Sequence, residues 1–216
     1  RIPGDIGNRE TWPFPVIYKT VKNASPRGAV LENADGLLEP FIAAAGQLVA
    51  EGASGITTSC GFLSLFQREL AAAVPVPVVT SSLMQVAMVN ATLPAGTRAG
   101  ILTISKETLT PRHLALAGVP QGTPIGATDP ECEFNRAILN DRPDMNIAEA
   151  RRNNIDAAKR LHQAHPNLGA IVLECTNMPP YAAAITTATG LPVYSIYDLV
   201  VWFQAGLRPR GLGERD

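Results

Sequence analysis

Cys60 and Cys175 occupy equivalent positions in an internal duplication of this 216-residue chain. Residues 55–60 (Gly-Ile-Thr-Thr-Ser-Cys) superimpose on residues 170–175 (Ala-Ile-Val-Leu-Glu-Cys), an offset of 175 − 60 = 115. Without a gap, residues 77–80 (Pro-Val-Val-Thr) then fall on residues 192–195 (Pro-Val-Tyr-Ser), because 192 − 77 is also 115. An offset of this length excludes a short-period solenoid and predicts two related halves, each with one thiol after a buried strand.

Paired thiols of this kind are suited to acid–base chemistry on one carbon atom. A Cys between a strand and the following helix lies near the helix N-terminus, which favours the thiolate and predicts a pKa lowered from roughly 8.5 toward neutrality. One thiolate can then remove an α-proton while the opposed thiol protonates the other face, which inverts the centre without a cofactor. A single Cys after a strand is as often a small core residue, but a matched pair in two repeats favours function.

Polar groups near the two thiols are candidates for holding a carboxylate and for stabilising the enediolate-like charge of a carbanion. The alternative is that the same Ser, Thr and Asn residues only cap helices, although capping and ligand contact are compatible. The candidates are Ser59, Gly61 and Phe62 around the first thiol, Thr176 and Asn177 after the second, and Thr80 and Ser81 at the end of the next strand.

Short apolar strands alternate with helical patterns along the chain. Strands are expected at 55–60, 76–80, 98–105, 123–127, 170–174 and 193–195, and helices at 37–51, 62–73, 82–91, 110–117, 146–165, 179–189 and 197–205. This alternation predicts an α/β fold of parallel sheets flanked by helices. With the duplication, it predicts two pseudosymmetric lobes, residues 1–95 plus 199–216 carrying Cys60 and residues 96–198 carrying Cys175. Because ligands bind at the carboxyl ends of such strands, the active site is expected in the cleft between the lobes.

Composition narrows the class of protein. Hydrophobic residues make up 46% of the chain, charged residues 17%, and the net charge is −1, so a sizeable core can form. No basic block and no long apolar run appears, which predicts that neither nucleic acid nor a membrane is a partner. Three widely spaced cysteines without a Cys/His cluster argue against disulfides and a metal site and favour a cytoplasmic protein. No signal peptide is recognised, but the chain begins at Arg1 rather than Met, which leaves room for a leader or a first strand before it.

The third cysteine, Cys132, stands between Glu131 and Glu133. Two flanking carboxylates raise the pKa of a thiol and make it a poor nucleophile. We therefore interpret Cys132 as incidental to any chemistry of the other two.

Residues 57–61 (Thr-Thr-Ser-Cys-Gly) and 173–177 (Leu-Glu-Cys-Thr-Asn), with Pro-Gly-Asp at 3–5, resemble the aspartate/glutamate racemase superfamily over nearly the whole chain. The resemblance implies a pseudosymmetric two-lobed fold, no cofactor, and catalytic roles for Cys60 and Cys175. It also implies that groups just after each Cys hold the substrate carboxylate and that the N-terminal loop reaches the ligand through Asp5 and Asn8. The function expected from it is a racemase or epimerase acting by two-base proton transfer on a small carboxylate, such as an amino acid.

Departures from the racemase pattern leave other activities open. Gly61-Phe62 follows the first Cys where amino-acid racemases have Asn-Thr, and Asn177 stands where glutamate racemases often have His. Hydantoin racemases, maleate-type cis-trans isomerases and arylmalonate decarboxylases belong to the same superfamily; the decarboxylases use one Cys, so the pair argues against them. A non-catalytic carboxylate-binding protein is the alternative of another class. The sequence specifies neither the substrate nor whether the chain forms a homo-oligomer.

Overall fold

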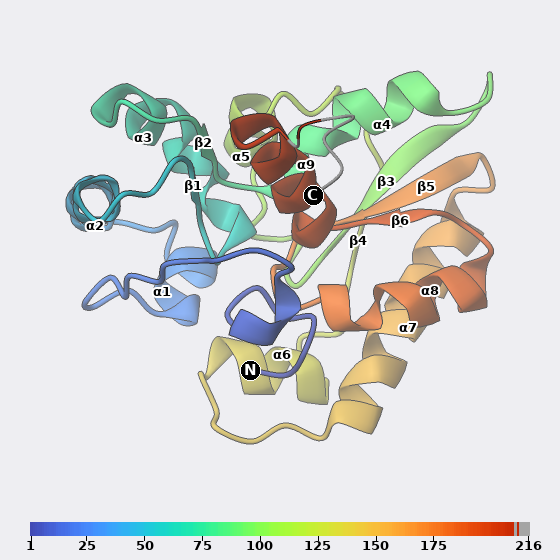
Figure 1. Ribbon diagram of the computed structural model, residues 1–216. Helices are drawn as coiled ribbons and strands as arrows, with labels where there is room; N and C mark the ends of the chain where they lie inside the picture. The colour runs from blue at the N-terminus through green and yellow to red at the C-terminus, as the bar shows by residue number, and fades with distance from the viewer. Residues whose placement is uncertain (210, 212–216) are drawn as a thin grey trace.

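Strands and helices alternate through a computed structural model that describes residues 1–209 and 211 (Figure 1). The strands are β1 (Ile56–Thr57), β2 (Val78–Val79), β3 (Arg98–Thr103), β4 (Ile125–Ala127), β5 (Leu168–Leu173) and β6 (Val193–Tyr194). The α-helices are α1 (Pro26–Leu31), α2 (Leu38–Ala50), α3 (Gln67–Ala73), α4 (Val86–Thr92), α5 (Pro111–Leu116), α6 (Glu133–Leu139), α7 (Ile147–Ala164), α8 (Ala182–Thr189) and α9 (Ile196–Leu207). Four short 3-10 helices complete the set: η1 (Arg9–Thr11), η2 (Gly61–Phe66), η3 (Ser82–Gln85) and η4 (Pro179–Tyr181).

Two parallel sheets form the framework, and the predicted fold class is confirmed. Strands β1 and β2 pair in a two-stranded sheet, and a four-stranded sheet has the order β4-β3-β5-β6. The central strands β3 and β5 are buried along nearly their whole length, which explains why their sequences are continuous apolar runs rather than alternating ones.

The internal duplication is preserved in the strand register. Ile56 pairs with Val78 in the small sheet, and Ile171 pairs with Val193 in the large one. Both residues of the second pair lie 115 positions after those of the first, since 171 − 56 and 193 − 78 are equal. The two halves therefore share their strand pairing as well as their sequence pattern.

The small and large sheets lie on opposite sides of Figure 1, with α1, α2 and α3 beside β1 and β2, and α7 and α8 beside the four-stranded sheet. One large apolar cluster packs around the four-stranded sheet and also includes Phe62, Leu83 and Val86 of the first half. Ile101, Leu102 and Ile171 are fully buried in it. The expected boundaries at residues 95/96 and 198/199 stay a prediction. Of the C-terminal segment assigned to the first lobe, residues 210 and 212–216 lie outside the described part of the chain.

The sequence pattern missed two helices and merged others. Helices α1 and α6 have only six and seven residues, too few for a helical period to be recognised. The helix expected at 62–73 begins as the 3-10 helix η2 and continues as α3, and the one expected at 82–91 is divided in the same way into η3 and α4. The 3-10 helices η2 and η3 follow directly after Cys60 and Ser81.

Candidate active site

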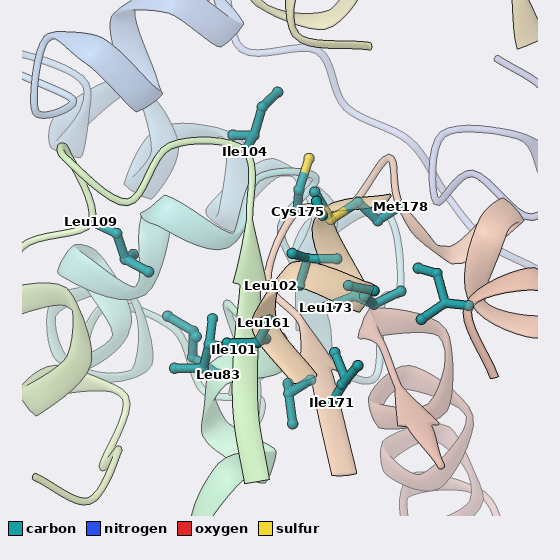
Figure 2. Packing of buried hydrophobic residues seen from close by; sticks show 14 of the residues in the cluster. Leu83, Ile101, Leu102, Ile104, Leu109, Leu161, Ile171, Leu173, Cys175 and Met178 are labelled. Carbon is teal, nitrogen blue, oxygen red and sulfur yellow. The ribbon is translucent and has the colours of Figure 1, made fainter. Parts of the chain in front are cut away.

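Both cysteines lie just beyond the carboxyl end of a strand, as the sequence predicted. Cys60 follows β1 by three residues and is the N-cap of η2, and Cys175 follows β5 by two. Figure 2 shows Cys175 beside Met178, beyond the strand ends that carry Leu102 and Leu173. Cys60 is partly exposed and Cys175 is buried, and both are free thiols. Each half of the duplication thus carries one thiol in the loop after a strand end.

The two loops that carry the thiols touch each other. A Cβ atom added to Gly61 would lie 2.3 Å from Oε1 of Glu174 and 2.4 Å from its carbonyl oxygen, so only glycine permits this approach. Ser82 Oγ, from η3 of the first half, donates a hydrogen bond of 2.6 Å to the carbonyl of Leu173. Burial is the main cause of the raised pKa of Cys175, and a charge on Cys60 raises it by a smaller amount.

Backbone N–H groups point at both sulfurs, but burial dominates their acidity. The N–H groups of Phe62 and Leu63 lower the pKa of Cys60, while burial and the nearby charge of Glu174 raise it to about 12. Burial and the charge of Glu174 likewise raise the pKa of Cys175 well above its ordinary value, against the N–H of Asn177. The expectation of thiol pKa values near neutrality is therefore wrong, because desolvation outweighs the helix N-terminus.

Glu174 is a functional candidate that the sequence analysis overlooked. Its side chain is fully buried, Thr103 Oγ1 donates a hydrogen bond of 2.7 Å to its Oε2, and its Oε1 has no partner among the described residues. Burial raises its pKa to about 7 against the opposing hydrogen bond from Thr103. A Glu that ends a run of four buried apolar residues is the sequence signal that could have identified it.

The N-terminal loop closes over the second thiol through Asp5 and Asn177. Asn177 Nδ2 donates a hydrogen bond of 2.6 Å to Asp5 Oδ2, and the Cys175 thiol donates to Asn177 Oδ1 at 3.7 Å. Asp5 is buried, forms an ion pair with Arg1 at 3.0 Å and accepts from the backbone N–H of Gly7 at 2.8 Å. The structure thus joins these two predicted residues into one hydrogen-bonded chain that ends at the sulfur.

A cavity of about 520 Å³ opens beside this chain of contacts. Its lining includes Arg1, Asp5, Arg142, Asn177 and Tyr181. Tyr181 is fully buried, its hydroxyl has no hydrogen-bond partner among the described residues, and burial raises its pKa to about 12. The charge of Arg151 lowers the pKa of this hydroxyl, and the charges of Asp5 and Cys175 raise it by smaller amounts.

The remaining predicted binding residues use their polar groups locally. Thr80 N and Oγ1 both donate to Gln67 Oε1, and Ser81 Oγ caps η3 through the N–H of Leu83. Asn8 caps η1 and donates to the carbonyl of Arg1.

Two further predicted positions, Phe62 and Ser59, contribute mainly through the backbone. The ring of Phe62 is buried and meets the edge of His113 at a centroid distance of 5.1 Å, so its N–H rather than its side chain faces the site. Ser59 is exposed, and its carbonyl faces the second half.

Cys132 lies apart from the thiol pair, in a groove with Asp129 and Asp156. Burial raises the pKa of its thiol, followed by a smaller rise from the charge of Asp129. Among residues 1–209 and 211, no group of His, Cys, Asp and Glu side chains has the geometry to hold a metal ion. No helix in that part of the chain has the length and hydropathy needed to span a membrane.

Curated proteins similar to this chain are lyases. A dimethylsulfoniopropionate lyase of Durusdinium sp. clade D is 30% identical over 207 residues, which cover 89% of this chain and 66% of that protein. Dimethylsulfoniopropionate lyase 7 of Emiliania huxleyi is 29% identical over 222 residues, 94% of this chain and 62% of the relative. The chain thus spans slightly less than two thirds of the length of these relatives. No protein-family model matches it.

Solved structures of similar shape come from racemases and a decarboxylase. A mutant of arylmalonate decarboxylase superimposes with a TM-score of 0.56 at 19% identity, covering 87% of this chain and 81% of that one. Aspartate racemase of Picrophilus torridus gives a TM-score of 0.56 at 13% identity, covering 90% and 80%. The chain has the aspartate/glutamate racemase fold. The lyase activity after which the sequence relatives are named was not among the activities expected from the resemblance to the racemase superfamily.

Proposed function

We propose that this chain is a cofactor-independent lyase that removes the α-proton of a small carboxylate and expels the substituent on the β-carbon. The proposed substrate is dimethylsulfoniopropionate, a carboxylate with a sulfonium group on its β-carbon. The observation that carries the proposal is the pair of free thiols after the strand ends of two duplicated halves, Cys175 buried and Cys60 partly exposed, beside the acids Glu174 and Asp5. Two relatives, 30% and 29% identical to this chain over 89% and 94% of its length, bear the name of that activity.

The elimination needs no group that the chain does not offer. The thiolate of Cys175 removes the α-proton, and the electron pair of the C–H bond forms the Cα–Cβ double bond. The C–S bond breaks, the sulfur leaves with the bonding pair as neutral dimethyl sulfide, and acrylate remains. The leaving group needs no proton, so one base suffices, and the backbone N–H groups beside the thiols can stabilise the charge that develops on the substrate carboxylate.

The positive sulfonium group of the proposed substrate also explains how such weakly acidic thiols are activated. The charged groups that shift the pKa of Cys175 are Glu174, Cys60 and Asp5, and each of them raises it. A sulfonium group bound beside these acidic groups neutralises their effect and lowers the pKa of the thiol, because an opposite charge nearby favours the ionised form. The thiolate is then produced when the substrate is bound.

The asymmetry of the two half-sites favours elimination over inversion. Glu174 is equivalent to Ser59 in the duplication, since 174 − 59 = 115, yet one is a buried acid and the other an exposed hydroxyl. A racemase must deprotonate and protonate at opposite faces with comparable ease. One thiol beside the Asp5–Asn177 chain and another at a more exposed loop suit a reaction with a single proton transfer.

The second candidate is a racemase or epimerase of a small carboxylate, the function expected from the sequence. It is supported by the shared strand register of the halves and by the N–H groups of Phe62 and Asn177, which are 115 residues apart and point at equivalent sulfurs. This reading requires both thiols, whereas elimination requires one.

The test compares the two reactions on the same protein. The chain is incubated with dimethylsulfoniopropionate and dimethyl sulfide is measured by gas chromatography; separately, chiral amino acids and hydantoins are incubated in deuterium oxide and read by NMR. We expect dimethyl sulfide and acrylate in equal amounts, loss of product in Cys175→Ser, and unchanged activity in the control Cys132→Ser. Deuterium at the α-carbon of a recovered chiral acid, without dimethyl sulfide from the sulfonium compound, would favour the racemase instead.

A further inference from the structure

Glu174 is a buried acid whose surroundings contain no group that stabilises its charge fully. Its exposed fraction is 0%, and its one hydrogen bond is the 2.7 Å contact from Thr103 Oγ1 at the end of β3. Its second oxygen is buried without a partner among the described residues. Burying an ionised carboxylate in this way is costly, so the surroundings favour its neutral form.

The carboxyl group is held between the two thiol loops. Glu174 directly precedes Cys175, and its Oε1 rests on the backbone of Gly61, which directly follows Cys60. Only the missing side chain of Gly61 makes room for it. The acid is therefore built into the contact between the half-sites and is not a side chain of one lobe alone.

The titratable groups that face one another here are all acidic. Cys60 comes from the loop after β1, Cys175 from the loop after β5, and Asp5 from the N-terminal loop acts on Cys175 while paired with Arg1. Charge on Glu174 opposes ionisation of both thiols. Like charges in one buried site cannot all be present together, as in a pair of carboxyl groups that share a proton.

We propose that Glu174 is a positioning residue that sets how readily the two thiols ionise: its negative charge, held between the loops of Cys60 and Cys175, opposes thiolate formation, and loss of that charge makes a thiolate easier to form. The inference deepens the proposed function and rests on it only in treating the two thiols as the working groups. Because burial raises the pKa of Glu174 to about 7, both of its forms are populated at neutral pH.

The test follows thiol reactivity without any substrate. In a Cys132→Ser background, alkylation of Cys60 and Cys175 by iodoacetamide is measured separately by peptide mass spectrometry across a pH series. We expect Glu174→Gln to lower the pH midpoint of the alkylation-rate profile by about one pH unit for at least one thiol. Below the midpoint, that thiol should then be alkylated about tenfold faster than in the parent. The control is Glu69→Gln in α3, a second Glu with a buried, unpartnered oxygen, which should leave the profiles as they are.

A second pair of variants tests the same inference if Glu174→Gln folds poorly. Thr103→Val removes the hydrogen bond that stabilises the carboxylate of Glu174 and so favours its protonated form. This variant should raise the alkylation rate of the thiols by a smaller factor than Glu174→Gln. Thr103→Ser keeps the hydroxyl donor and should match the parent. Parent-like or slower alkylation in both Glu174→Gln and Thr103→Val would overturn the inference. Because no substrate takes part, a failed lyase assay with shifted alkylation profiles would reject only the proposed reaction.

Discussion

Thr176 Oγ1 donates a hydrogen bond of 2.6 Å to the carbonyl of Ser59, across 117 residues of sequence. Its counterpart by the internal duplication is the contact of Gly61 with Glu174, because 176 − 61 and 174 − 59 are both 115. In each of the two contacts, the residue directly after one Cys therefore meets the residue directly before the other Cys. The contact is reciprocal in backbone placement but not in chemistry, since one side is a hydrogen bond and the other an acid against a glycine.

The hydrogen bond of Thr176 should measurably hold the halves together. Thr176 is buried, so Thr176→Val leaves the Ser59 carbonyl without this donor and should lower the free energy of unfolding by about 1–2 kcal/mol. Urea titration provides the measurement. Thr187→Val is the matched control, because the exposed Thr187 bonds only within its own helix; its effect should stay within about 0.5 kcal/mol. Equal effects at the two sites would contradict the role of Thr176.

Gly61 should not tolerate a side chain. In Gly61→Ala the new Cβ would meet Glu174 Oε1 and its backbone carbonyl at 2.3 Å and 2.4 Å, so the two loops must separate. We expect a loss of about 3 kcal/mol in the free energy of unfolding together with a loss of turnover. Gly46→Ala in α2, where a Cβ meets nothing within 4 Å, should instead stabilise the fold by about 0.5–1 kcal/mol. A Gly61→Ala protein with parent-like stability and activity would remove the close contact from the argument.

Asn177→Asp should damage the second half-site at constant volume. The change replaces a donor to Asp5 with a second carboxylate, which repels Asp5 and raises the pKa of Cys175 further. We expect kcat/KM for dimethylsulfoniopropionate to fall at least about tenfold, with slower alkylation of Cys175 at every pH below the midpoint. Asn167→Asp, in the exposed turn before β5, should leave both quantities close to those of the parent.

The free energy of unfolding should depend on pH through Glu174. Its pKa is about 7 in the folded chain against an ordinary value of 4.5, so between these values the folded state binds more protons than the unfolded one. The contribution of Glu174 to the free energy of unfolding is therefore fully present below about pH 4.5. As pH rises to 7, the free energy of unfolding falls by up to about 3 kcal/mol through this group. Relative to the parent, Glu174→Gln should become more stable by this amount across the window, as measured by urea titration at each pH. A constant difference would show that Glu174 titrates normally.

His113 acts in the opposite direction over nearly the same range. Burial lowers its pKa from 6.5 to about 4, so the unfolded chain binds the additional proton between these values and stability from this group falls as pH falls. In the parent, the contributions of Glu174 and His113 to the pH dependence of the free energy of unfolding should therefore nearly cancel between about pH 4.5 and 6.5. The contribution of each group is seen only when the other is replaced. For this reason the Glu174 comparison is made as a difference from the parent.

Much of the fold follows from local patterns. The apolar runs of β3 and β5 predicted buried parallel strands, and the helix expected at 146–165 is present as α7, whose Asn146 cap accepts the Glu149 N–H. The register of the halves followed from one offset in the sequence. The short helices α1 and α6 did not, because six or seven residues are stabilised by tertiary packing rather than by a recognisable period.

The sequence by itself determined that two thiols stand at equivalent strand ends of a duplicated α/β chain, because residue type, strand pattern and offset are properties of the chain alone. Only the tertiary structure decided their acidity and their partners. Burial raises the pKa of both thiols where the helix N-terminus alone would lower it, and Glu174 becomes part of the site because Gly61, 113 positions earlier, leaves it room. Desolvation and contacts between distant segments arise only when the two halves pack together, so no local pattern contains them.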